Sequence, residues 1–407
     1  MNAGVRCAPP PRNPPSVLRR LRQSLALAAV ALGVCGSALA RDCLAPGAWF
    51  ATESDAVRPV KGNDLLAEMA RRQVLLLGET HDDADDHAWQ LATLGALHLL
   101  RPQMVIGFEA FPRRAQPVLD KWIAGELSER QLLEQADWDK VWGWPADLYL
   151  PLFRFARINR IPMRALNVDR ALIKAISSNG WQAVPESQKE GVTRPAAPSP
   201  AYLDDLFEVY KMHPEGKGPD KDRQSPGFLH FVDSQTTWDR AMAQGLAQAA
   251  RASDGASQAL VVGIVGSGHI RYGRGVAYQL RDLGIENIGM LLPVGASRDC
   301  AGLAGIADAV FAVPKLPASE PPPPRLGARI EQTKEGVGIE EVVKGSLAEY
   351  SGLRAGDRIV SIAGVNVARM GEVLRAVRAQ PPGTWLPIRI RREGRELDLV
   401  VKFPPER

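Results

Sequence analysis

The segment Val74–His81, with the sequence VLLLGETH, decides the fold of this chain. Four apolar residues in a row are typical of a strand that is buried on both faces of a parallel sheet. The glycine at position 78 allows the backbone to turn sharply, so Glu79 and His81 should stand at the carboxyl end of that strand. In open α/β sheets, this is the edge where ligands bind.

A second copy of the pattern lies far downstream. The apolar run Leu260–Val265 leads directly into Gly266–His269, with the sequence GSGH. Other strand-like runs alternate with amphipathic helical stretches, at Met104–Phe108, Ile161–Leu166 and Ile288–Leu292. This alternation predicts an α/β fold with a largely parallel sheet flanked by helices.

Polar residues follow several of the expected strands. Glu109 comes directly after the second run, and Asn167 and Asp169 come after the third. If the strands are parallel, these groups converge with His81 and His269 at one edge of the sheet. We therefore expect both histidines to face the same crevice, within reach of one ligand.

Composition and charge exclude some classes of function. The chain has 407 residues, 45% of them hydrophobic and 24% charged, which is ordinary for globular proteins. Its net charge of +4 is too small to argue for nucleic acid binding.

The N-terminus has the pattern of a secretory signal peptide. Arginines at 19, 20 and 22 precede a short apolar run at 25–34, and Ser37–Ala40 ends in the small-x-small pattern that signal peptidase cleaves. We expect cleavage after Ala40 and export to the periplasm, with no transmembrane span in the mature protein and with membrane association left open. A retained signal anchor is the alternative.

Cleavage would leave two cysteines, Cys43 and Cys300. An even number of cysteines in an oxidising compartment favours a disulfide. Because Cys43 precedes the first expected domain and Cys300 follows its last expected strand, we predict a disulfide that joins the two ends of that domain. Two free thiols are the alternative.

The sequence divides into four parts. We expect a signal peptide at 1–40, an α/β domain at 41–313, a proline-rich linker at 314–324 and a small β-rich domain at 325–407. Four consecutive prolines at 321–324 favour an extended linker.

The C-terminal part resembles a PDZ domain. The run Gly345–Gly364, GSLAEYSGLRAGDRIVSIAG, is similar to the Gly-Ser-Pro-Ala to Gly-Asp motif of bacterial PDZ domains, with Leu347 in place of the common proline. PDZ domains bind extended peptides by strand addition and often capture a C-terminal carboxylate. The resemblance implies a carboxylate loop at 325–328, a pairing edge at 328–332 and a facing helix, with peptide-binding residues Leu326, Gly327, Ala328, Val373 and Val377.

The larger part resembles the ChaN-like haem-binding uptake family, which belongs with the TIKI, TraB and erythromycin-esterase-type proteins. The resemblance covers about Val74 to Val294 and rests on the two Gly-x-x-His motifs, on Gly107-Phe108-Glu109, on 152–167 and on 235–242. It implies an exported protein that binds haem or an iron complex and contributes to iron uptake. A homodimer is left open.

Haem requires an axial ligand and an apolar slot. The family includes tyrosine-ligated haem proteins, and Tyr272 lies three residues after His269. The cofactor-binding residues expected from the resemblance are His81, His87, Asn167, Asp239, Met242, His269 and Tyr272.

Two other functions are consistent with the same residues. TIKI-like relatives resemble metal-dependent hydrolases, which implies a divalent metal held by His81 and His269 with Glu79 or Glu109, the spare glutamate then acting as catalytic base in a peptidase or esterase. The third hypothesis is a peptide-binding scaffold in which only the PDZ domain is active. We expect Trp138, Trp142 and Trp144 to be packing residues rather than cofactor contacts.

Overall fold

A computed structural model describes residues 43–212, 222–252, 258–296, 300–314, 324–333 and 335–405. The expected signal peptide and nearly all of the expected linker lie outside these ranges. No helix among the described residues is long and apolar enough to cross a membrane.

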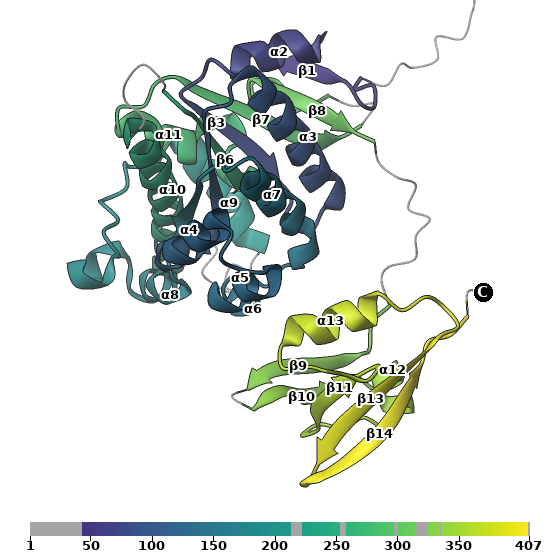
Figure 1. Ribbon diagram of the computed structural model, residues 1–407. Coiled ribbons are helices and arrows are strands. Elements are labelled where there is room, and N and C mark those ends of the chain that lie inside the picture. The colour runs from purple at the N-terminus through teal and green to yellow at the C-terminus, as the bar shows by residue number, and fades with distance from the viewer. Residues whose placement is uncertain are drawn as a thin grey trace, which may run out of the picture.

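The first unit is built on an eight-stranded sheet with helices on both faces (Figure 1). Its strand order is β2-β1-β8-β7-β3-β6-β4-β5. The strands from β8 to β5 are parallel, and β1 and β2 add an antiparallel edge. The strands are β1 Trp49–Thr52, β2 Val57–Val60, β3 Val74–Glu79, β4 Met104–Pro112, β5 Met163–Asn167, β6 Leu260–Gly266, β7 Ile288–Gly295 and β8 Ala309–Val313.

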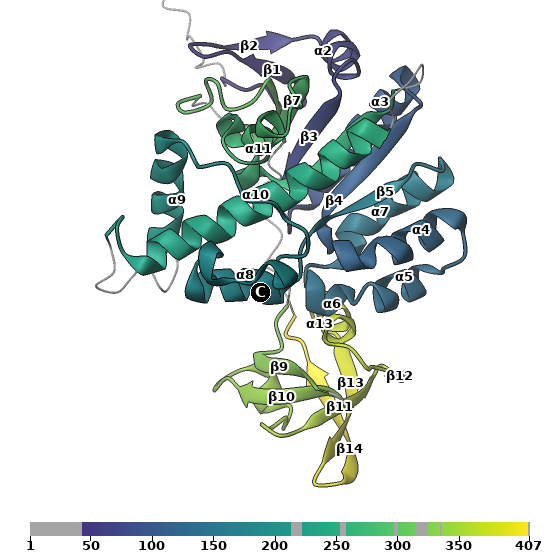
Figure 2. The ribbon, with the colours of Figure 1, turned by 90° about the vertical axis from the view of Figure 1, so that its left-hand side faces the viewer.

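The two faces of the sheet carry separate cores because side chains alternate along each strand. On β3, Leu75 and Leu77 belong to one core, and Val74 and Leu76 belong to the other. The first core is covered by α3 Ala84–Leu100, α4 Gln116–Ala124, α5 Glu129–Gln135 and α7 Ala146–Ile158, together with α2 Gly62–Met69 and α6 Trp138–Val141. The second is covered by α10 Pro226–Ala252 and α11 Val276–Asp282. Figure 2 shows α10 crossing this face, with α8 Arg170–Asn179 and α9 Pro200–Met212 beside it.

The second unit is a small antiparallel β structure with its own core. Its strands follow the order β14-β13-β11-β10-β9, and β12 pairs with β11. The elements are β9 Ala328–Thr333, β10 Gly336–Val342, α12 Leu347–Tyr350, β11 Arg358–Ile362, β12 Val365–Asn366, α13 Met370–Arg378, β13 Trp385–Arg392 and β14 Arg395–Lys402.

The fold class is confirmed, since all five strands expected in the α/β unit are present. The sequence pattern does not reveal the strands in 41–72 or the one after Cys300. The short strands β1 and β2 carry too few residues for a clear pattern, and Pro59 lies inside β2. The expectation that Cys300 follows the last strand was wrong, because β8 comes after it.

The predicted disulfide joins Cys43 and Cys300, whose Cα atoms lie 5.9 Å apart. It ties the segment before β1 to the connection between β7 and β8. Because the bond closes a loop with a sequence separation of 257, it restricts the unfolded chain strongly.

Replacing Cys300 with serine should therefore lower the free energy of unfolding by about 2–4 kcal/mol. Urea denaturation of the mature protein, with and without a thiol reductant, measures the change. Reductant should destabilise the wild type to the level of Cys300→Ser and should leave the variant unchanged. Equal stability of all four samples would show that the bond does not constrain the chain.

Candidate functional site

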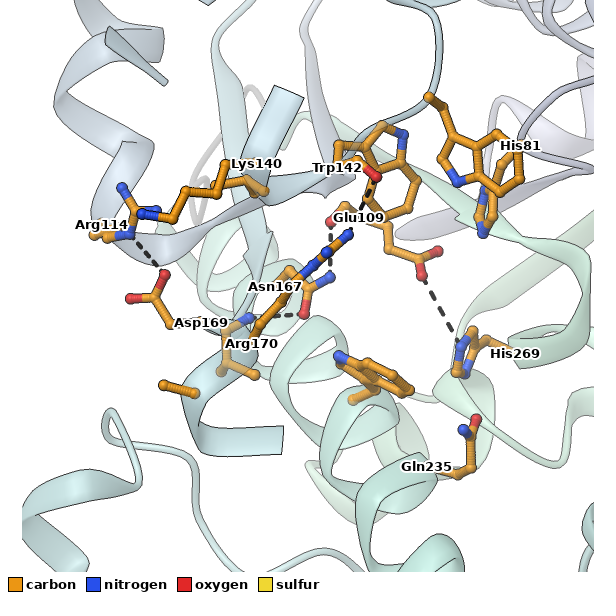
Figure 3. A pocket seen from close by; sticks show the side chains of 15 residues that line it. His81, Glu109, Arg114, Lys140, Trp142, Asn167, Asp169, Arg170, Gln235 and His269 are labelled. Carbon is orange, nitrogen blue, oxygen red and sulfur yellow. Dashed lines mark hydrogen bonds and ion pairs between the residues drawn. The ribbon is translucent and has the colours of Figure 1, made fainter. Parts of the chain in front are cut away.

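The site is positioned by the parallel pairing of β3 with β6. In this register Glu79 is opposite Gly266, so both Gly-x-x-His segments leave the sheet at the same level. Strand β4 pairs on the other side of β6 and ends its pairing at Phe108 opposite Ile264, which places Glu109 beside Gly266. The result is a cavity of about 530 Å³ lined by His81, Glu109 and His269 (Figure 3).

His81 is fixed by a buried carboxylate. Its Nδ1 lies 2.8 Å from Oε1 of Glu79, which also accepts a 2.5 Å hydrogen bond from the hydroxyl of Tyr149. The other oxygen of Glu79 accepts a hydrogen bond from Gln90 at 3.0 Å. Since Nδ1 is engaged, Nε2 of His81 is the nitrogen that can meet a ligand.

His269 is held in the same way from the other side. Its Nδ1 lies 2.7 Å from Oδ1 of the fully buried Asp239 on α10. The second oxygen of Asp239 accepts a 2.7 Å hydrogen bond from the hydroxyl of Tyr202 on α9. Nε2 of His269 is 4.0 Å from Oε1 of Glu109, whose Oε2 accepts a hydrogen bond from the amide of Gly266. The site thus contains two Tyr–carboxylate–His chains.

Gly266 is required by this crowding. A Cβ atom at this position would lie 2.9 Å from Cε1 of His81 and 3.4 Å from Oε2 of Glu109. Any side chain here would displace one of these two groups. The first glycine of the GSGH segment therefore lets His81 and Glu109 lie close to the backbone of β6.

The buried carboxylates favour the charged form of both histidines. Burial alone would lower the pKa of His269, but the charge of Asp239, its hydrogen bond and the charge of Glu109 raise this pKa to about 9. Burial also opposes the charged form of His81, while the hydrogen bond to Glu79 and the charge of Glu109 raise its pKa overall. Burial would raise the pKa of Glu79, but the hydrogen bond from His81, the charge of His87 and the hydrogen bond from Tyr149 lower it overall. His269 is therefore mainly in its charged form at neutral pH.

The outer part of the cavity has an aromatic wall and a basic rim. The ring of Trp142 lies 4.7 Å from that of His81, and Trp238 lies 6.3 Å from His269, both with edge-on geometry. Trp144 completes the wall. The basic residues that line the cavity are Arg114, Lys140 and Arg170 (Figure 3).

Four of the sequence-predicted site residues line the cavity, namely His81, Glu109, Asn167 and His269. Two others support them from behind, since Glu79 and Asp239 are buried and bound to the histidines. Asn167 donates a hydrogen bond to the carbonyl of Glu109 at 3.0 Å.

Three expected cofactor contacts lie elsewhere. His87 is buried, within hydrogen-bond distance of Gln90 and of the carbonyl of His81. Met242 is buried in the core that α10 forms with the sheet. Tyr272 does not line the cavity, and its hydroxyl donates to the carbonyl of Gly302 at 2.7 Å.

The sequence did not indicate several cavity residues. Trp142 and Trp144 were expected to be packing residues, and the structure places both on the cavity wall. Only Trp138 of that group is buried. The signal in the sequence was the unusual density of tryptophan in 138–144, between the second and third site strands, but spacing alone does not show which ring faces a cavity.

The metal hypothesis gains no support. Among the described residues, no group of three or more His, Cys, Asp and Glu side chains could hold a metal ion. Both oxygens of Glu79 are bound by neighbouring side chains, so this carboxylate serves to hold His81 in place.

The second unit has a groove of about 440 Å³ between β9 and α13. All of the expected peptide-binding residues line it: Leu326, Gly327, Ala328, Val373 and Val377. Because β9 is at the edge of the described sheet, its backbone is available to pair with an added strand.

Comparisons with known proteins agree with this architecture. A model of the PDZ domain matches residues 338–392. Among solved structures, the chain is similar to "Cofacial heme binding to ChaN of Campylobacter jejuni", with a TM-score of 0.50, 18% identity, and coverage of 66% of this chain and 98% of that one. It also matches "Crystal Structure of the HtrA3 PDZ Domain Bound to a Phage-Derived Ligand", with a TM-score of 0.18, 23% identity, and coverage of 19% and 82%. No curated protein matches the chain.

The family model described as "Haem-binding uptake, Tiki superfamily, ChaN" matches residues 65–280, more than half of the chain and all of the site strands from β3 to β6. The chain therefore belongs to the ChaN-type haem-binding uptake family of the Tiki superfamily.

Proposed function

We propose that this protein is exported, binds haem in the cavity between His81 and His269, and contributes to iron uptake. The observation that carries the proposal is a pair of histidines, each bound through Nδ1 to a buried carboxylate, in an aromatic cavity with a basic rim. The similar structure from Campylobacter jejuni is one of cofacial haem binding to ChaN, and this likeness supports haem as the ligand.

The cavity residues fit the chemistry of haem. Haem is a flat aromatic ring with two carboxylate arms, and its iron takes an axial nitrogen or oxygen ligand. Three tryptophans offer apolar surface for such a ring. Lys140 and Arg170 offer positive charge for its carboxylates; Lys140 is 3.6 Å from the carboxylate of Asp137, and Arg114 is paired more closely with Asp169, at 2.6 Å.

The two histidines are suited to serve as axial ligands. Each uses Nδ1 to bind a carboxylate, an arrangement that orients the ring and increases the basicity of Nε2. Tyr149 and Tyr202 hold these carboxylates in turn. The chain's own contribution is therefore to orient two nitrogen ligands and to cover them with apolar surface.

The second unit supplies a peptide-binding module. Its groove would take a protein C-terminus with an apolar last residue, since apolar side chains from β9 and α13 line it. Such a module would bring the haem-binding unit to a partner protein. The disulfide between Cys43 and Cys300 is consistent with an oxidising compartment.

Titration of the mature protein with haem should produce a Soret band distinct from that of free haem. The His81→Ala and His269→Ala variants should shift this band or weaken binding by at least tenfold, because each removes a nitrogen ligand. His98→Ala is the matched control, since His98 is on α3 against Phe155 and does not line the cavity. An unchanged spectrum in both cavity variants would exclude histidine ligation.

Haem affinity should also depend on pH. Because the pKa of His269 is raised to about 9, its ring is protonated at neutral pH, and ligation through Nε2 must displace that proton. If His269 is the ligand, affinity should rise by up to about tenfold per unit as the pH approaches 9 and should level off above it. In Asp239→Asn the pKa of His269 should fall, so the plateau should begin at a lower pH. A flat profile for the wild type would assign ligation to another residue.

Export can be tested separately. Cell fractionation should place the protein in the periplasm, and sequencing of the mature N-terminus should begin at Arg41, after the expected cleavage at Ala40. A replacement of Ala40 by a bulky residue should leave the precursor uncleaved. Recovery of uncleaved wild-type protein in the cytoplasm would contradict the proposed location.

A further inference from the structure

Helix α13 of the PDZ unit lies against α6, the loop that follows it and the first turn of α7 (Figure 2). Arg375 of α13 is 3.3 Å from the carboxylate of Asp147, and Arg369 is 3.8 Å from that of Asp139. The contact brings Arg375 on α13 and Arg369 at its N-cap to two aspartates of the haem-family unit, and Arg369 is also paired with Glu372 at 3.0 Å.

The approach of α13 to this loop is close. Gly371, in the first turn of α13, has no side chain, and a Cβ atom there would come within 3.0 Å of Cγ of Asp139. A bulkier residue would have to displace the carboxylate of Asp139 or the helix itself. The two units are therefore packed against each other at this point, and the packing depends on a glycine.

Three residues connect the sites of the two units. Trp144 lines the haem-family cavity and also a cleft of about 320 Å³ between the units. On the other side of this cleft, Leu374 and Arg378 of α13 line both the cleft and the peptide groove. The cavity and the cleft thus share Trp144, and the cleft and the peptide groove share Leu374 and Arg378.

We propose that docking of α13 on the α6–α7 loop supports the aromatic wall of the cavity, so that a protein C-terminus bound in the PDZ groove alters haem affinity. This inference rests on the haem-binding function proposed above and adds its control by a second ligand. The occupant of the groove is a peptide with a free C-terminal carboxylate and an apolar last side chain, which matches the lining of the groove.

The strength of the contact suits reversible control. The side chains of Arg375 and Asp147 are 53% and 61% exposed, so their ion pair is weak and is screened by salt. Modest changes in the position of α13 can therefore release the loop. By thermodynamic reciprocity, haem must change the affinity for the peptide by the same factor as the peptide changes the affinity for haem.

The docking is tested with two variants that touch neither ligand site. Arg375→Asp places a negative charge against Asp147, and Gly371→Val pushes α13 from Asp139. Both should increase hydrogen exchange of backbone amides 138–147 in the haem-free protein and weaken haem binding by at least fivefold. The double variant Asp147→Arg/Arg375→Asp should restore both values, because it reverses the ion pair.

Arg391→Asp is the matched control, since Arg391 pairs with Glu396 within the β13–β14 hairpin. It should leave exchange and haem affinity unchanged. Unchanged exchange in Arg375→Asp and Gly371→Val would overturn the docking. Increased exchange with unchanged haem affinity would show that the docking does not influence haem binding, and would overturn the proposal. If exchange increases but the wild type binds no haem, the proposed function fails while the docking stands.

The groove is tested with a pool of labelled pentapeptides that end in Val, Leu, Ile or Phe with a free carboxylate. We expect the peptides that bind to change haem affinity at least fivefold in the wild type and to have no effect in Arg375→Asp. Amidated versions should not bind. Absence of binding by every free-carboxylate peptide, or equal haem affinity with and without bound peptide, would overturn the role of the groove.

Discussion

The site depends on the parallel pairing of β3 with β6, which sets Glu79 opposite Gly266. Shifting this register by one residue would exchange the faces of the strand and separate the two histidines. The pairing is strongly fixed because β3 is buried along its whole length, with cores on both faces. Gly266 then lets the groups from neighbouring strands approach each other. The geometry of the site is thus a consequence of the packing of the sheet.

Burying Glu79 and Asp239 has a cost, since an ionised carboxylate loses its hydration inside a protein. The structure offsets this cost with several partners for each group. Glu79 receives hydrogen bonds from Tyr149 and Gln90 in addition to His81. Asp239 is bound by His269 and by the hydroxyl of Tyr202. Tyr149 on α7 and Tyr202 on α9 are therefore part of the site, although neither needs to touch a ligand.

The sequence predicted the parts of the site that follow directly from strands. His81, Glu109, Asn167 and His269 come immediately after apolar runs, and parallel strands bring such residues together. It could not predict Tyr149 or Tyr202, because helix packing rather than chain order carries their hydroxyls to the carboxylates. Tyr272 shows the opposite error. It is only three residues from His269, but its positive φ of 58° turns the chain, and its hydroxyl binds Gly302 instead.

The two sides of the cavity are determined by different kinds of structure. The histidines belong to the edge of a buried sheet. Trp142 and Trp144 belong to the segment between α6 and α7, and neither side chain is fully buried. The chain turns at Asp137, just before α6, and at Gly143, just after it, both with positive φ, so local backbone geometry rather than sheet register sets the position of the rings. The positions of the two histidines are therefore fixed by the core, while the shape of the cavity depends on a segment that the second unit contacts. In the coupling proposed above, the PDZ unit acts on the shape of the cavity and leaves the two histidines in place.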